Sequence, residues 1–147
     1  MAVDIPDLMK LTQAQLDDLF KQSPAGPIPD GEAEGTAIIA PGTELEGPAA
    51  EFIRDFDWQG KVFDASAGEL RNKILPIGLK AVIAKVYLGT SWYDGNECIV
   101  LDYSQTSLVA HRIRDEIRLV GDGVYLGIVF WDKDKLIDFA LKFPTTT

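Results

Sequence analysis

Cysteine and histidine are almost absent from this chain of 147 residues, which has one of each, Cys98 and His111. A single cysteine excludes an internal disulfide and is typical of a reducing compartment. One histidine and one cysteine cannot build a zinc site, and no Asp/Glu cluster has the loop spacing of a calcium or magnesium site. Gly-rich phosphate loops, Gly-x-Ser-x-Gly and His-Glu-x-x-His are missing too. We therefore expect no metal and no cofactor.

Long apolar runs are also absent, and none approaches the about 20 residues that a membrane helix needs. The N-terminal segment MAVDIPDLMK has Asp4 and Asp7 where a secretory signal would have basic residues. Together these features predict a soluble, cytoplasmic protein that is neither exported nor membrane-bound.

Basic residues are scarce in the first third of the chain. Residues 1–57 contain 12 acidic and three basic residues, whereas residues 58–147 contain 11 of each, so the net charge of −9 resides in the N-terminal part. An acidic surface repels phosphate backbones and anionic lipids, so we expect neither nucleic acid nor membrane as a partner. The acidic segment is either a solubilising surface or a docking face for a basic protein.

The size and apolar content indicate one domain over residues 1–147 with a single packed core, since 46% of the residues are hydrophobic. Residues 1–30 form a helical and turn-rich lead. Within it, Thr12 and Gln15 have the spacing of a capping box, and apolar residues follow at helical spacing, which predicts an amphipathic helix over residues 12–22. That helix is too short to persist alone, so we expect Leu16, Leu19 and Phe20 to dock on the rest of the domain.

The remainder, residues 31–147, is predicted to be mainly β. We expect strands at residues 32–39, 58–63 and 136–143, a helix at 48–54, and a meander from residue 79 onward, with residues 64–78 assigned to neither class. About seven or eight antiparallel strands with one apolar face would close into an up-and-down barrel.

Turn residues predict how the strands of the meander pair. The pairs Asp94-Gly95 and Asp122-Gly123 are typical of two-residue hairpin turns, and a three-residue loop is expected at residues 104–106. These turns place Leu88 opposite Leu101, Leu101 opposite Val109, and Ile117 opposite Ile128. One continuous face is then apolar, and the other carries charged residues that include Arg112, Arg114, Glu116 and Arg118.

Two segments resemble a known family. Residues 55–63, Asp-Phe-Asp-Trp-Gln-Gly-Lys-Val-Phe, are similar to the first motif of the GXWXG family of uncharacterised bacterial proteins, with Trp58 and Gly60 matching and Phe56 at the position of the first glycine. Residues 101–130 are similar to a later segment of that family, which includes Tyr125-Leu126-Gly127. The resemblance implies a lipocalin-like barrel and supplies no established activity.

His111 is the residue that this register singles out, because it lies on the apolar face opposite Ile99. Glu97 lies diagonally across from it, and Thr90 faces Ile99 from the next strand, so a ring nitrogen, a carboxylate and a hydroxyl would converge at one end of an apolar interior. His111 is then a packed and satisfied core residue, a group that orients a ligand, or a general acid/base.

Other polar residues of the predicted sheet have more than one possible role. Asp115 has inward parity, and a β-bulge would turn it outward. Tyr103 is a core aromatic or a hydrogen-bond donor that lines a pocket. The three arginines at 112, 114 and 118 are expected to form surface ion pairs rather than to bind an anionic ligand. The expected ligand-binding residues are Thr90, Glu97, Ile99, Tyr103, His111, Ile113 and Phe130, and the candidate catalytic residues are His111, Glu97 and Tyr103.

Three functions remain open on these observations. The first is an intracellular barrel that binds a small apolar or aromatic molecule in its interior. The second is a cofactor-independent isomerase, cyclase or lyase that uses His111 as acid or base in the same cavity. The third is a protein-interaction module that uses its acidic N-terminal face. A small ligand is the expected partner, and homodimer formation is left open.

Overall fold

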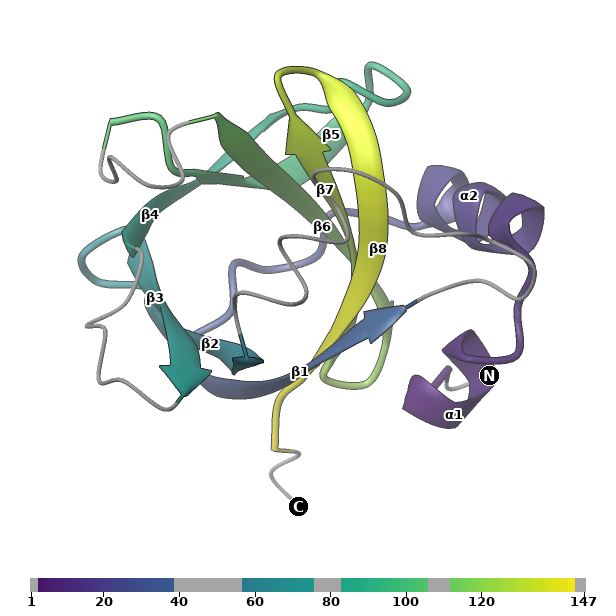
Figure 1. Cartoon of the computed structure of the whole chain (residues 1–147), viewed down its shortest axis with the longest axis horizontal. Coiled ribbons are helices and arrows are strands. Elements are labelled where there is room, and N and C mark those ends of the chain that lie inside the picture. Colours follow the sequence, from purple (N-terminus) through teal and green to yellow (C-terminus); the bar gives the residue numbers. More distant parts are fainter. Residues whose placement is uncertain (1–2, 39–56, 76–82, 106–111, 145–147) are drawn as a thin grey trace.

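Eight antiparallel strands form a closed barrel in which each strand pairs with the next and the last pairs with the first (Figure 1). The computed structural model describes residues 3–38, 57–75, 83–105 and 112–144. This up-and-down order confirms the predicted fold class. The strands are β1 Gly31–Ile38, β2 Asp57–Asp64, β3 Glu69–Leu75, β4 Ile83–Thr90, β5 Glu97–Asp102, β6 Ile113–Gly121, β7 Val124–Trp131 and β8 Asp134–Lys142.

The strands agree in large part with the predicted ranges. β1, β2 and β8 lie within two residues of the expected strands, and β3 occupies part of the stretch from 64 to 78 that the pattern left unassigned. The predicted helix at residues 48–54 lies outside the described residues. No helix in the described ranges is long and apolar enough to cross a membrane.

Two short helices precede the barrel, α1 Ile5–Leu8 and α2 Gln13–Gln22, and α2 lies outside the barrel beside β8 (Figure 1). The capping box of α2 is confirmed: the hydroxyl of Thr12 accepts from the backbone N–H of Gln15 at 3.2 Å, and the Gln15 side chain accepts from the backbone N–H of Thr12 at 2.9 Å. Leu16 and Phe20 are each 1% exposed, so the predicted docking of this helix is confirmed.

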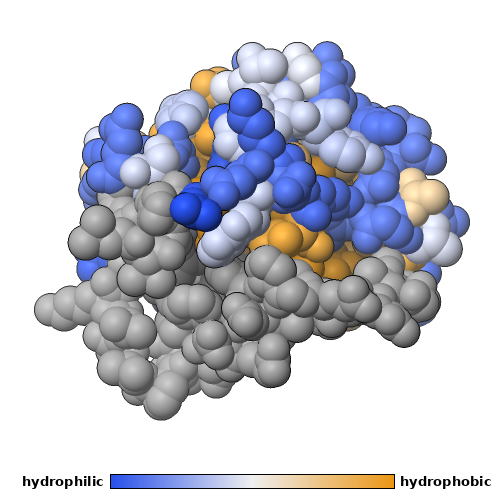
Figure 2. Space-filling view, turned by 45° about the horizontal axis from the view of Figure 1, so that its top comes forward, coloured by the Kyte–Doolittle hydropathy of each residue, from blue (hydrophilic) through white to orange (hydrophobic). Residues whose placement is uncertain are grey.

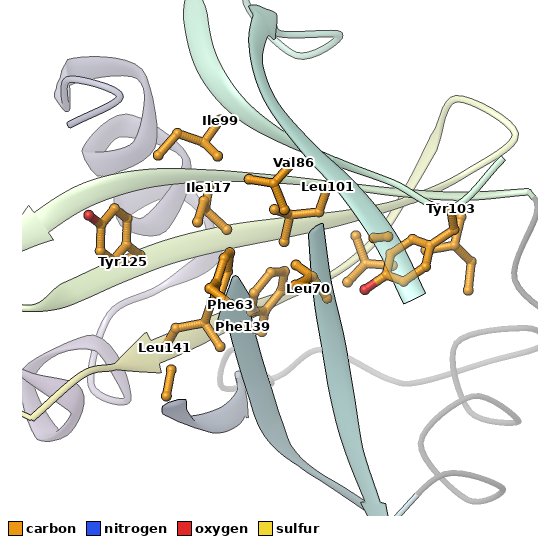
Figure 3. Packing of buried hydrophobic residues seen from close by; sticks show 14 of the residues in the cluster. Phe63, Leu70, Val86, Ile99, Leu101, Tyr103, Ile117, Tyr125, Phe139 and Leu141 are labelled. Carbon is orange, nitrogen blue, oxygen red and sulfur yellow. The ribbon is translucent and has the colours of Figure 1, made fainter. Parts of the chain in front are cut away.

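The domain has an inner and an outer apolar cluster, one on each side of the sheet. The inner cluster lies inside the barrel (Figure 3), and the outer cluster lies between the helices and the outer face of β7 and β8. Burying each large apolar side chain of α2 contributes about 2–3 kcal/mol, which compensates for the low intrinsic stability of a ten-residue helix. The outer cluster consists of Leu8, Leu16, Phe20, Ile38, Val124, Leu126, Ile128, Phe130 and Ala140.

The predicted register of the first hairpin is wrong by two residues. Leu88 pairs with Ile99 rather than with Leu101, because β4 and β5 are joined by a loop over residues 91–96 instead of a two-residue turn. The backbone N–H of Ser91 donates to the carbonyl of Asn96 at 2.9 Å, which closes this loop. A shift by two residues keeps every side chain on its predicted face.

The other two predicted registers are also wrong. Leu101 pairs with Asp115, so it cannot face Val109, which itself lies outside the described residues. Ile117 pairs with Gly127 rather than with Ile128, because the ladder between β6 and β7 shifts between Leu119 and Gly121. This one-residue shift moves Leu126, Ile128 and Phe130 from the predicted inner face to the outer cluster.

Candidate functional site

A lysine, a tyrosine and an aspartate meet inside the barrel. The ammonium group of Lys61 donates to the hydroxyl of Tyr103 at 2.8 Å, and its Nζ atom lies 3.1 Å from Oδ2 of Asp115. The Tyr103 hydroxyl in turn donates to Oδ2 of Asp115 at 3.3 Å. Each of the three residues is at most 3% exposed. We call Lys61, Tyr103 and Asp115 the interior polar site.

Apolar side chains surround this site. Nζ of Lys61 lies 5.5 Å from the ring centroids of both Tyr103 and Phe139, which belong to the inner cluster. Tyr103 and Tyr125 lie at opposite ends of the residues labelled in Figure 3, and Phe139 lies between them. Among the described buried charged residues, Lys61 and Asp115 are the pair that contacts this interior.

A β-bulge in β2 positions Lys61. The ladder between β2 and β3 shifts between Trp58 and Gly60, and Gly60 has a φ of +147°. A Cβ atom on Gly60 would lie 2.1 Å from the carbonyl oxygen of Ala33 on β1, so only glycine allows the two strands to approach this closely. Beyond the bulge, Lys61 and Phe63 share the inward face.

Asp115 reaches the interior from β6, two residues after Ile113 and two before Ile117, both of which are in the inner cluster. The alternative that a bulge turns Asp115 outward is wrong, because β6 pairs regularly with β5 and β7 at this position. Its Oδ1 atom is buried and has no hydrogen-bond partner among the described residues. An unpartnered buried carboxylate oxygen is energetically costly.

Burial shifts the two ionisable groups in opposite directions. Desolvation lowers the pKa of the Lys61 ammonium below its ordinary 10.5, and the Asp115 carboxylate opposes this shift only in part. Desolvation also raises the pKa of the Asp115 carboxyl above its ordinary 3.8, against the attraction of Lys61. The two groups are therefore closer to exchanging a proton than a surface lysine and aspartate are.

Some of the predicted site residues lie in the interior. Tyr103 is part of the polar site, and Ile99 and Ile113 belong to the inner cluster. The structure thus brings three of the expected residues into the interior. His111 lies outside the described residues, so its predicted place in the interior stays a prediction.

The other predicted site residues lie elsewhere. Thr90 and Glu97 pair with each other where β4 ends and β5 begins, and both are exposed, so the prediction that they lie in an enclosed interior is wrong. Phe130 is buried in the outer cluster, where its ring packs edge-on against Trp92 at 5.7 Å between centroids, so its predicted place inside the barrel is also wrong. The bulge between Leu119 and Gly121 is the reason.

The predicted ion pairs of the arginine row are confirmed, although Arg118 is not at the surface. It is 1% exposed and makes a bidentate contact with Asp94, at 2.6 and 2.7 Å. It also donates to the carbonyl of Phe20 at 2.8 Å, and thereby links α2 to the barrel. Arg114 pairs with buried Glu116 at 3.1 Å, and Arg112 pairs with Asp132 at 3.4 Å.

A hollow lies on the outside of the barrel. It has a volume of about 290 Å³, and Trp92, 44% exposed, stacks with Arg114 at 4.3 Å from ring centroid to Cζ. The hollow contains three basic and two acidic side chains, so it has little net charge. Its lining comprises Trp92, Asp102, Ser104, Arg112, Ile113, Arg114, Asp132 and Lys133.

The described atoms on the face drawn in Figure 2 are mostly hydrophilic, with small apolar areas between them.

Thiolate and metal chemistry have little support in the described ranges. Cys98 is fully buried, and burial raises the pKa of its thiol to about 12, so it is not a thiolate near neutral pH. Groups of three or more His, Cys, Asp or Glu side chains able to hold a metal ion do not occur in the described part of the chain.

Sequence reasoning did not select Lys61. It stands between Gly60 and Val62 in a strand whose alternation is interrupted by the bulge, so simple counting from Trp58 assigns it no clear face. The one available signal is Phe63, since a large aromatic two residues away predicts that Lys61 shares its inward face.

Comparisons with known proteins support the fold alone. No protein-family model matches the chain, and no curated protein does. A solved structure described as a crystal structure of a protein from Thermomonospora curvata is similar, with a TM-score of 0.65 and 17% sequence identity. The match covers 92% of this chain and 89% of that one. The similarity to the GXWXG family remains a prediction.

Proposed function

We propose that this barrel binds a small apolar or aromatic molecule in its interior and that the interior polar site orients it. The observation that carries the proposal is Oδ1 of Asp115, which is buried and has no hydrogen-bond partner in the part of the chain that the structure describes. A ligand hydroxyl, carbonyl or amine next to this atom would satisfy it, while the apolar part of the ligand would contact the surrounding side chains.

The energetic cost of the site is a second argument. Burying an ammonium and a carboxylate together is often less favourable than burying two apolar side chains of similar size, so the Lys61–Asp115 pair does little for stability. A barrel that needed only to fold would be served as well by an apolar pair. Recognition of a ligand's polar group would explain why the interior has a charged pair there, whereas the requirements of folding would not.

The test is native mass spectrometry of the protein purified from its own host, which detects a retained small molecule. The Asp115→Asn variant should lose that molecule, or bind it with an affinity lower by about 10–100-fold, the effect of one buried hydrogen bond of about 1–3 kcal/mol. The matched control is Asp132→Asn, which changes an exposed aspartate in the outer hollow. If only the control variant loses the molecule, the ligand binds outside and the proposal is wrong.

An acid–base enzyme in the same interior is the second candidate. The specific observation in its favour is that the pKa values of Lys61 and Asp115 are shifted toward each other within hydrogen-bonding distance. An isomerase or lyase needs a base that removes a proton from carbon and an acid that protonates the carbonyl oxygen or the leaving group. Proton exchange with deuterated water at a ligand carbon next to a carbonyl, present in the native protein and absent in Asp115→Asn, would favour this function over simple binding.

A further inference from the structure

We propose that Lys61 forms an imine with the carbonyl carbon of its ligand, so that the barrel selects apolar aldehydes or ketones. This inference rests on the proposed interior binding and adds the chemical class of the ligand. Its basis is the geometry around Nζ of Lys61, which has a phenol hydroxyl at 2.8 Å and a carboxylate oxygen at 3.1 Å in an apolar interior.

Imine formation needs an amine that is partly neutral, since only the free lone pair attacks a carbonyl carbon. Lys61 is 3% exposed, and burial is the main cause that lowers its pKa. Exposed lysines such as Lys85, whose side chain is 49% exposed and pairs with Glu69 at 2.9 Å, lack this burial. Burial therefore makes the Lys61 amine more nucleophilic near neutral pH than a lysine with the ordinary pKa of 10.5.

The neighbours of Lys61 supply the proton transfers. The amine nitrogen attacks the carbonyl carbon and forms the C–N bond, while the carbonyl oxygen takes a proton from the Tyr103 hydroxyl or from Asp115. The nitrogen then returns a proton to the same pair of groups. Next the C–O bond breaks, the oxygen leaves with a second proton as water, and the C=N bond forms. No oxidant or reductant is needed.

The product preserves the charge balance of the interior. A protonated imine is a cation at the place of the ammonium, so Asp115 keeps a positive partner close to its Oδ2 atom. An amide at Lys61 would instead be neutral and leave the Asp115 carboxylate buried without a counter-charge, at considerable cost. The pair is therefore compatible with a carbonyl ligand and poorly compatible with an acylating one.

The ring contacts favour a flat, conjugated ligand. The rings of Tyr103 and Phe139 both lie 5.5 Å from Nζ of Lys61, and small residues such as Ala33 and Ala84 line the same interior. Aromatic rings beside a new C=N bond would contact an aryl or polyene group attached to it. An aromatic aldehyde is therefore the most suitable probe.

The experiment treats the intact protein with naphthaldehyde and sodium cyanoborohydride, which reduces a protonated imine to a stable amine. Peptide mapping by mass spectrometry then locates the modified lysines over time. We expect Lys61 to be modified faster than Lys85, because burial lowers the pKa of the Lys61 ammonium and so raises the fraction of neutral amine. The matched variants are Lys61→Arg, which keeps a cation that forms no imine, and Lys85→Arg.

Naphthylmethanol, which has the same ring system without a carbonyl, separates this inference from the proposed function. If naphthylmethanol binds in an Asp115-dependent manner while the aldehyde labels Lys61 no faster than Lys85, the imine is excluded and interior binding stands. If neither compound binds and Lys61 is unlabelled, both proposals are wrong. Mapping of the wild-type protein suffices for this decision, even if Lys61→Arg fails to fold.

Discussion

Nζ of Lys61 lies 3.1 Å from Oδ2 of Asp115, and both side chains are 4% exposed. The two residues come from β2 and β6, which are not neighbours in the sheet, so the contact crosses the interior of the barrel. A buried pair of this kind has an asymmetric energetic role, since removing one partner leaves the other charge or dipole unsatisfied, whereas removing both does not.

Single and double replacements of this pair should therefore have different effects on the free energy of unfolding. Lys61→Met or Asp115→Val alone should lower the free energy of unfolding by about 3 kcal/mol or more, whereas the double variant should be about as stable as the wild type or more stable. Urea unfolding followed by tryptophan fluorescence measures the free energy of unfolding of the single and double variants. If the double variant loses as much as the two single variants together, the pair is a structural requirement and the argument from energetic cost is wrong.

Gly60 should tolerate no side chain. Gly60→Ala places a Cβ atom 2.1 Å from the Ala33 carbonyl oxygen, so we expect the free energy of unfolding to fall by more than about 3 kcal/mol. Gly95→Ala is the matched control, because Gly95 also has a positive φ of 77° but has open space around its Cα atom. It should cost only about 1 kcal/mol. Equal losses in thermal unfolding would show that backbone conformation, and not the approach of β1, requires glycine at position 60.

The turn residues predicted the strand order and failed on the details of pairing. Asp122-Gly123 is a two-residue turn, with Gly123 at a φ of +70°. Three residues earlier a bulge changes the register, and nothing in the local sequence indicates it. Here the N-terminal segment crosses the strand so closely that a Cβ atom on Gly121 would lie 2.1 Å from the carbonyl oxygen of Val3. A contact between residues this far apart along the chain is invisible to turn statistics.

A contact between residues far apart along the chain also explains the wrong register predicted for the first hairpin. Asp94-Gly95 lies within a longer loop because Ser91 donates to the Glu116 carboxylate at 2.5 Å and accepts from the backbone N–H of Tyr93. Glu116 comes from a strand that follows this loop by twenty residues or so, which single-sequence reasoning does not place beside Ser91. The predicted faces of Ile99 and Tyr103 were correct because this shift was by two residues. Ile113 was also predicted on the correct face, because the pairing of β5 with β6 shifted by an even number of residues, from Val109 to Asp115 opposite Leu101.

The buried pair between Asp94 and Arg118 should make the protein sensitive to acid. The hydrogen bonds from Arg118 lower the pKa of Asp94 from 3.8 to about 2. Because the folded pKa is the lower one, the pair stabilises the fold in full above the ordinary value, and this contribution is lost as the pH falls from 3.8 toward about 2. In that range the unfolded chain binds the proton first.

Asp94→Ala should lower the free energy of unfolding at neutral pH by about 3 kcal/mol, since the Arg118 guanidinium stays buried without its carboxylate. The variant should also lose less stability than the wild type on acidification. Asp132→Ala, which removes the exposed partner of Arg112, should change stability by less than about 1 kcal/mol. Urea titrations at several pH values measure how the free energy of unfolding of each variant depends on pH. A parallel acid response in Asp94→Ala and the wild type would contradict the assigned pKa.

Tyr103 and His111 together test which residues orient the ligand. Tyr103→Phe removes the hydroxyl between Lys61 and Asp115 but leaves those two groups in contact, so the free energy of unfolding should change by no more than about 1.5 kcal/mol. Binding of naphthylmethanol, measured by calorimetry, should weaken by about 10–100-fold if the hydroxyl helps to hold the ligand's polar group. The same binding measurement on His111→Phe tests the residue that the sequence pattern singled out. If it weakens binding and Tyr103→Phe does not, the polar end of the ligand lies near His111, and the interior polar site has been assigned the wrong role.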